Sequence, residues 1–448
     1  MLNKIRYLAI LNFFVLILLS LCISCQPITS NNKAALINYD YSFYFENIDS
    51  LKSSNVKLID KYKDQYEFIS MPVDWNNTDG TKFNLRVFHA NPDFKKVKKI
   101  FLFAIGGPGE PLDEEFAIKI NKALGDDWDF IVFDHRGAAL SAYTVDKKRI
   151  DLKYLTISQS VEDIHSLVTD IKKGDVKALI VGGDSAGAIL SLQYAVKYSD
   201  EIDMLYIDGG APSAEFINIS NRKTLDMITE KLKPLNIGEI ADYYNVNHDL
   251  MFETLMNFGA EDPGLKQDFW NDFKNKNSNA EKMLKNYFEA NVLVPPFEEE
   301  NKLINAIVTT QRLYYTIGCM DYLPEKQDIS SLYTFLKSYN DMSKIFADKY
   351  NLRRNPFNYK EQLGKIKTDT IITDGLDDYI IPFQNSIDIY KLMDNTNAVL
   401  FGVKDTAHVV IITDQYEFIA ELINKYIETK SLSEVKKFIT KNKKAVLY

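Results

Sequence analysis

One pentapeptide in the chain carries the residue types needed for nucleophilic chemistry. It reads Gly-Asp-Ser-Ala-Gly at residues 183–187 and fits the pattern G-x-S-x-G, with Ser185 at its centre. A short apolar run precedes it at residues 178–181, and a helical pattern begins at Ala188. A serine at a sharp turn between a strand and a helix is held out at the end of the strand, where a base can reach it. Glycines flank such a turn because neighbouring backbone leaves no room for side chains. Ser185 is therefore the predicted nucleophile.

A serine hydroxyl is a poor nucleophile unless a base takes its proton, and an acid must orient that base. The chain has five histidines, at positions 89, 135, 165, 248 and 408. In sites built on this kind of turn, the order along the chain is Ser, then Asp or Glu, then His. His408 is the histidine that follows a later apolar run, at residues 398–403, in that order. We predict that His408 is the base.

The acid should follow the predicted strand at residues 370–373, where Asp374, Asp377 and Asp378 are candidates. One helical pattern and one strand pattern separate Asp378 from His408, which is enough chain to return both to one edge of a sheet. The pattern alone does not separate Asp377 from Asp378. The carboxylates that are not used are expected to cap the loop or the next helix.

Backbone N–H groups are needed to receive the negative charge that develops on the attacked carbonyl oxygen. Ala186, directly after the nucleophile, is predicted to supply one. The loop Gly-Gly-Pro-Gly at residues 106–109 follows an early apolar run and is predicted to supply the other, from Gly107. A glycine loop can also hold phosphate. However, no Lys-Ser/Thr pair follows this loop and no G-x-G-x-x-G is present, which argues against nucleotide binding.

The elements that must position these residues alternate between strand and helix. Buried strand patterns at residues 99–105, 129–134, 178–181 and 204–207 are separated by helical ones, which predicts a parallel sheet with helices on both faces. An antiparallel hairpin is expected before them, at residues 66–89. The predicted core is therefore α/β and split, with a first part at residues 61–213 and a second part at 364–448. Residues 214–363 lose the alternation and are predicted to form a helical cap insertion.

The beginning of the chain has the features of an export signal. Lys4 and Arg6 precede an apolar run at residues 7–23, and Leu-Cys-Ile-Ser-Cys ends at Cys25. This pentapeptide resembles the lipobox of bacterial lipoproteins, which implies that Cys25 is lipidated and that residues 1–25 are the signal segment. The alternatives are an ordinary secretory peptide or an uncleaved anchor. Residues 26–60 are then a tether and N-terminal segment. The resemblance implies a protein anchored by lipid, facing the periplasm or the cell surface, and Gln26 is compatible with the outer membrane.

Composition further narrows the class of protein and the kinds of site that the chain can have. The 448 residues are 46% hydrophobic and 26% charged, as in ordinary globular proteins, and the formal charge is −9 without a basic cluster for nucleic acid. Of three cysteines, only Cys319 remains after the signal segment, so no internal disulfide is expected. The histidines are scattered and Cys319 has no partner, so we predict neither a metal site nor a cofactor.

Several motifs resemble those of the α/β-hydrolase serine aminopeptidases, which include proline iminopeptidase and the secreted tripeptidyl aminopeptidases. The similar stretches run from about residue 66 to residue 423. They are Met-Pro-Val-Asp-Trp at 71–75, Gly-Gly-Pro-Gly at 106–109, Asp-Phe-Ile-Val-Phe-Asp-His-Arg-Gly at 129–137 with Ser141, Cys-Met-Asp at 319–321, and Gly375, Asp378 and Pro382. The resemblance implies the α/β-hydrolase fold and favours Asp378 as the acid. It also suggests Asp321, on the cap, as the residue that binds a substrate's amino terminus.

The resemblance implies an exported serine aminopeptidase that takes peptides with a free amino terminus. The chain departs from the pattern at two places. Ile105 stands where proline iminopeptidases have histidine, which favours the tripeptidyl group. Asp184 and Ala186 stand beside Ser185 where aminopeptidases more often have glycine and an aromatic residue, and Asp-Ser-Ala-Gly also occurs in esterases. A carboxylesterase or lipase with the same three residues is therefore the alternative. A binding protein on an inactive hydrolase scaffold is the third possibility.

Overall fold

The structure is a computed structural model, which describes residues 61–106, 112–146, 148, 150–212, 362–378, 381–393 and 395–448. These residues all belong to one compact unit, comprising residues 55–226, 311–325 and 343–448. Four features predicted from the sequence lie outside the described residues. They are the signal segment with Cys25, the tether, Gly107 with the rest of its loop, and the helical insertion with Asp321.

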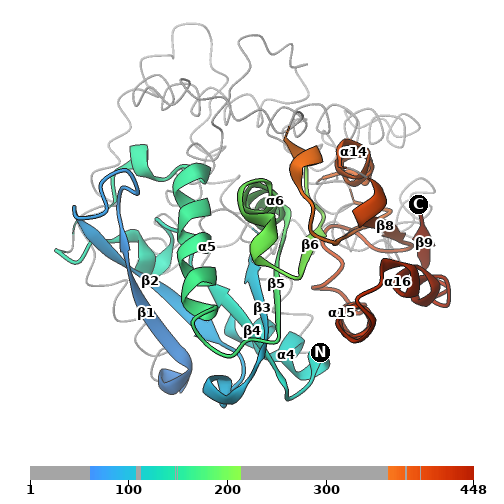
Figure 1. Ribbon diagram of the computed structural model, residues 1–448, viewed down its shortest axis with the longest axis horizontal. Coiled ribbons are helices and arrows are strands. Elements are labelled where there is room, and N and C mark those ends of the chain that lie inside the picture. Colours follow the sequence, from blue (N-terminus) through green and yellow to red (C-terminus); the bar gives the residue numbers. More distant parts are fainter. Residues whose placement is uncertain are drawn as a thin grey trace, which may run out of the picture. The chain divides into compact units, whose positions relative to one another are not determined.

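The described strands form one sheet in the order β1-β2-β4-β3-β5-β6-β7-β8-β9 (Figure 1). The strands from β4 to β8 in this order are parallel, whereas β1, β2 and β9 pair antiparallel with their neighbours. This is the predicted α/β-hydrolase fold. The bounds are β1 Tyr66–Pro72, β2 Lys82–His89, β3 Lys99–Ala104, β4 Trp128–Phe133, β5 Ala178–Asp184, β6 Met204–Asp208, β7 Thr370–Gly375, β8 Ala398–Val403 and β9 Ala445–Leu447.

Helices cover both faces of the sheet, as expected where parallel strands are buried on both sides. On one face, α4 (Glu114–Leu124) packs beside α15 (Tyr416–Thr429), and α15 beside α16 (Leu432–Ile439). Their apolar stripes close a core over strand residues that include Phe101, Phe103 and Phe130. On the other face, α5 (Ile157–Ile171) packs against α6 (Ser185–Tyr198), which lies on β5 and β6. Helix α14 (Gln384–Leu392) contacts β7 and β8.

Continuous apolar runs predicted the central strands because these strands have no exposed face. Every residue of β4, β5, β6, β7 and β8 is buried. The predicted hairpin is also present, with Tyr66 opposite Phe88 and Pro72 opposite Lys82. Helix α16 and strand β9 were not predicted from the sequence. Among the described helices, none combines the length and the apolar character needed to cross a membrane.

His89, at the end of β2, lies between two carboxylates. Its Nδ1 is 2.7 Å from Asp129 Oδ2, its Nε2 is 3.4 Å from Glu67 Oε2, and Phe94 stacks on the ring. Burial by itself lowers the pKa of His89, but the hydrogen bonds and charges of Asp129 and Glu67 outweigh it and raise the pKa to about 9. The ring is therefore an imidazolium at neutral pH and forms ion pairs with both carboxylates.

The pH dependence of stability should reveal this ion pair. The folded pKa of His89 lies above the unfolded value of about 6.5, so its contribution is fully present below pH 6.5 and is lost as pH rises through about 9. The size of the contribution is about 3 kcal/mol at most, since each pKa unit corresponds to about 1.4 kcal/mol. We expect the difference in free energy of unfolding between wild type and His89→Gln to shrink from pH 6 to pH 10 in urea titrations. A difference that stays constant over this range would contradict the assignment.

Candidate active site

Ser185 lies at the turn where β5 ends and α6 begins. Its backbone φ is +50°, in the left-handed region that non-glycine residues avoid. The strand ends at Asp184 and the helix starts at Ser185 itself, so the two elements are joined without an intervening loop. Strain of this kind persists only where the surrounding structure imposes it, and it is common at functional sites. The geometry therefore agrees with the sharp turn that the pentapeptide predicts.

The glycines of the pentapeptide are there because other backbone passes very close. A Cβ on Gly187 would lie 1.9 Å from the carbonyl oxygen of Ala104, at the end of β3. A Cβ on Gly183 would lie 2.4 Å from the carbonyl oxygen of Gly187. Both distances are far below van der Waals contact, so any side chain at either position would force β3, β5 and α6 apart.

His408 and Asp378 are brought together by the loops after β8 and β7. His408 Nδ1 is 2.5 Å from Asp378 Oδ2, and the other oxygen of Asp378 accepts the N–H of Ile381 at 2.9 Å. Because the carboxylate accepts a hydrogen bond from Nδ1–H, the Nε2 of the neutral ring is left as an acceptor. Among the residues that the structure describes, the buried Nε2 has no hydrogen-bond partner. An imidazole in this state can take a proton from a hydroxyl group.

The strand order places Ser185 and His408 at the same edge of the sheet. Strands β5, β6, β7 and β8 are parallel neighbours, so the residues that follow them share one edge. Gly209, directly after β6, has φ +58°, and a Cβ there would lie 3.2 Å from His408 Cε1. The end of β6, next to the strand that carries Ser185, therefore lies against the imidazole ring.

The three candidate acids have different surroundings. Asp378 is the one that contacts His408. Asp374 accepts the hydroxyl of Ser386 at 2.9 Å, and its burial and the nearby charge of Asp378 raise its pKa well above the ordinary range. Asp377 donates its backbone N–H to the carbonyl of Thr406. The structure thus separates two neighbours, Asp377 and Asp378, that the local pattern left equivalent.

Asp208, at the end of β6, holds the loop that carries His408. Its carboxylate accepts the N–H groups of Val410 at 3.0 Å and Ile411 at 2.7 Å. Val409, between these residues and His408, has φ +64°, so the loop is strained and needs such an anchor. Burial raises the pKa of Asp208 to about 7, although the two backbone hydrogen bonds oppose the rise. No local pattern in the sequence predicts this role for Asp208.

The charge state of His408 depends on all the carboxylates around it. Burial by itself lowers its pKa, but the charge and hydrogen bond of Asp378 raise it, and the charges of Asp184 and Asp208 raise it further. The net effect is a pKa above the ordinary histidine value. The base therefore becomes protonated at a higher pH than a free histidine would.

Of the two backbone N–H groups predicted to bind the negatively charged oxygen, that of Ala186 lies in the described residues. Ala186 lies in the first turn of α6, where backbone N–H groups have no partner inside the helix. The N–H of Gly106 is already used, because it donates to Asp184 Oδ1 at 2.7 Å. The second donor must therefore come from elsewhere, and Gly107, which was predicted for this role, lies outside the described residues.

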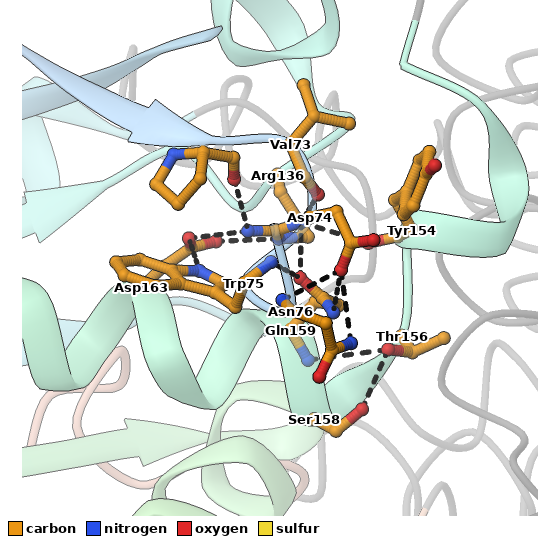
Figure 2. Close-up of polar contacts among 11 residues, drawn as sticks. Val73, Asp74, Trp75, Asn76, Arg136, Tyr154, Thr156, Ser158, Gln159 and Asp163 are labelled. Atoms are coloured by element: carbon orange, nitrogen blue, oxygen red, sulfur yellow. Dashed lines mark hydrogen bonds and ion pairs between the residues drawn. The ribbon is translucent and has the colours of Figure 1, made fainter. Parts of the chain in front are cut away.

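Other signature residues have a structural role (Figure 2). The guanidinium of Arg136 binds both oxygens of Asp163 on α5, with distances of 2.7 Å and 2.6 Å. It also donates to the carbonyl of Val73 at 2.8 Å, and Trp75 Nε1 donates to Asp163 at 2.8 Å. The motifs at residues 71–75 and 129–137 therefore meet in one buried polar cluster that joins the hairpin to α5.

A family model described as alpha/beta hydrolase fold matches residues 99–415, which include Ser185, Asp378 and His408. A proline iminopeptidase of Pestalotiopsis fici is 24% identical over 305 residues, which cover 68% of this chain and 83% of that protein. One of Thermoplasma volcanium is 28% identical over 142 residues, 31% of this chain and 45% of that protein. The solved proline iminopeptidase of Mycobacterium smegmatis has a TM-score of 0.47 at 12% identity, covering 82% of this chain and 100% of that one.

Proposed function

The chain belongs to the alpha/beta hydrolase fold family, and we propose that it is a serine peptidase that removes residues or short peptides from free amino termini. The main support for hydrolase activity is the His408–Asp378 contact of 2.5 Å, at the sheet edge that also holds the strained Ser185. The peptidase part rests on the motifs shared with serine aminopeptidases and on the identity to the Pestalotiopsis fici proline iminopeptidase.

In the proposed mechanism, Ser185 Oγ attacks the carbonyl carbon of the substrate while His408 Nε2 takes the hydroxyl proton. Asp378 holds the ring in the tautomer that leaves Nε2 free to do so, and it stabilises the imidazolium that forms. The N–H groups of Ala186 and Gly107 receive the oxyanion. The imidazolium then gives its proton to the leaving amine. Water repeats the sequence on the acyl-enzyme, with His408 again as the base, and releases the acid and free Ser185.

Substrate class is tested with the purified full-length chain. Short peptides with a fluorescent leaving group are compared with their N-acetylated forms and with a short-chain ester. An aminopeptidase should turn over only the free-amine peptides efficiently, because the ammonium group is part of what it binds. Efficient turnover of the ester, with no preference for a free amine, would reassign the protein as an esterase. Absence of any turnover would leave the binding-protein alternative.

Asp321 is the proposed partner of the substrate's ammonium group. Asp321→Asn should raise KM for free-amine peptides and leave turnover of the ester unchanged, because the ester has no ammonium to bind. Unchanged peptide kinetics in this variant would remove Asp321 from the proposal.

The raised pKa of His408 leads to a prediction about pH. With an ester substrate, which has no amine to titrate, kcat/KM should fall on the acid side with a midpoint above the ordinary histidine value of about 6.5. The reason is that the free enzyme loses its base when Nε2 is protonated. A midpoint below about 6.5 would mean that the surrounding carboxylates do not act on His408 as described.

We also propose that the protein is exported and carries a lipid on Cys25. The support is the basic and apolar order of residues 1–24 and the lipobox resemblance. Cells grown with labelled palmitate should incorporate label into the wild-type chain and not into Cys25→Ala. Equal labelling of both would refute this assignment.

A further inference from the structure

The peptide group between Ile105 and Gly106 is hydrogen-bonded at both of its polar atoms. Its carbonyl oxygen accepts from His135 Nε2 at 2.9 Å, and its N–H donates to Asp184 Oδ1 at 2.7 Å. Both side chains are buried, with 3% of His135 and 7% of Asp184 exposed. Three strands contribute, because the peptide follows β3, His135 follows β4, and Asp184 ends β5. In the proposed mechanism neither side chain has a role.

The chemistry of each contact is fixed by what its partner can do. A carbonyl oxygen only accepts, so Nε2 of His135 must carry the hydrogen. Burial lowers the pKa of His135 to about 4, so the ring is neutral at physiological pH and bears one proton. An amide N–H only donates, so Asp184 Oδ1 must accept. Burial raises the pKa of Asp184 to about 6, and the Gly106 N–H opposes that rise. Near neutral pH the carboxylate is ionised, which strengthens the bond.

These two contacts act on opposite edges of one rigid plane. Because the peptide group is planar, rotating it would break both hydrogen bonds together. Gly106 is also packed against the nucleophile's turn: a Cβ there would lie 2.7 Å from Ser185 Cβ and 2.6 Å from Asp184 Oδ2. The start of the glycine loop is thus docked directly on the residues around Ser185.

We propose that Asp184 and His135 are positioning residues, which clamp the Ile105–Gly106 peptide and so hold the start of the glycine loop against the turn that carries Ser185 and the N–H of Ala186. This inference rests on the proposed function, since it assigns the clamp to the reaction of Ser185. It also gives a role to the carboxylate of Asp184, one of the departures from the aminopeptidase pattern. Ile105 contributes only its backbone to the clamp, and Asp184 provides a carboxylate where glycine is more common.

The charge of Asp184 acts on the groups around it, in addition to holding the peptide in place. The ionised Asp184 lies close enough to His408 to raise the pKa of its ring, as do Asp378 and Asp208. Its charge also acts on Asp208, at the end of β6, and on Tyr206, within that strand. Asparagine would keep an acceptor oxygen for Gly106 and remove the charge. The positional and electrostatic effects of Asp184 can therefore be separated by comparing two substitutions.

The kinetic experiment uses the full-length chain and an ester or peptide that the wild type turns over. Asp184→Ala should lower kcat by about 100-fold with little change in KM, because a misplaced oxyanion donor affects the transition state and not ground-state binding. Asp184→Asn should recover most of that loss and move the acid limb of the pH profile to lower pH. His135→Gln, which keeps an N–H donor, should likewise be more active than His135→Leu. Equal activity of the alanine and asparagine variants, or an acid limb that does not move, would overturn the proposal.

A spectroscopic experiment tests the clamp without relying on turnover. Labelling isoleucine carbonyls with ¹³C and glycine nitrogens with ¹⁵N selects the Ile–Gly peptides, of which the chain has three, at residues 105–106, 237–238 and 317–318. One amide signal should shift in Asp184→Asn and titrate in the wild type near pH 6, where Asp184 is protonated. If none of the three signals does so, the clamp is wrong. If one does and the wild type is inactive on every substrate, the proposed function fails while the clamp stands.

Discussion

Ser185→Ala is expected to lower kcat for every substrate by about 10⁴- to 10⁶-fold, which is the loss seen when a serine nucleophile is removed from a complete triad. Only the oxyanion donors and substrate binding would remain to accelerate attack by water. The measurement is turnover of the preferred substrate together with labelling by a fluorophosphonate, which reacts with activated serines. Both signals should disappear. Retention of either at the wild-type level would place the nucleophile elsewhere.

A matched substitution separates the loss of chemistry from the state of the turn. Ser185 has φ +50°, which is costly for any residue with a Cβ. Ser185→Gly should be as inactive as Ser185→Ala but more stable by about 1 kcal/mol, because glycine adopts this conformation without a clash. The free energies of unfolding of the two variants in urea provide the comparison. A glycine variant less stable than the alanine variant would show that the turn is not strained.

The second large effect is expected at the buried pair of Arg136 and Asp163. Asp163→Ala should reduce the free energy of unfolding by about 3 to 5 kcal/mol, because it leaves the guanidinium buried without a counter-charge. Burial raises the pKa of Asp163 despite the opposing charge of Arg136, so desolvation is already the larger effect on this carboxylate. Trp75 Nε1 also loses its acceptor. The urea midpoint, followed by circular dichroism, measures the change.

Two further variants control for this result. Asp93→Ala removes the exposed partner of Lys96, a pair whose side chains are 68% and 79% exposed, and it should leave the free energy of unfolding nearly unchanged, because water screens an exposed ion pair. The double variant Arg136→Met with Asp163→Leu should be more stable than Asp163→Ala, since it leaves no unpaired charge inside. If Asp163→Ala is as stable to urea as the exposed control Asp93→Ala, the cluster in Figure 2 does not hold the hairpin to α5.

The amino-acid pattern was sufficient to predict the central strands, most of the helices that cover them and the strand–turn–helix at Ser185. Central strands were recognisable because burial on both faces demands continuous apolar runs, as at β3, β4 and β5. The steric reason for the glycines was also accessible, because a strained turn restricts residue types locally. Helix α16 and β9 were not predicted; their short segments, of eight and three residues, give periodicity little length over which to appear.

Contacts between polar groups that are distant in sequence follow from the strand order and the loops. The local pattern left the neighbours Asp377 and Asp378 equivalent and the family resemblance favoured Asp378, while the loops after β7 and β8 bring Asp378 into contact with His408, 30 residues away. Asp208 meets the residues after His408 across about 200 positions, and Asp184 meets Gly106 across 78. Local patterns report how a segment is buried, because periodicity reflects which face is apolar. They do not report which distant carboxylate accepts which N–H, because that depends on strand order and on the path of each loop.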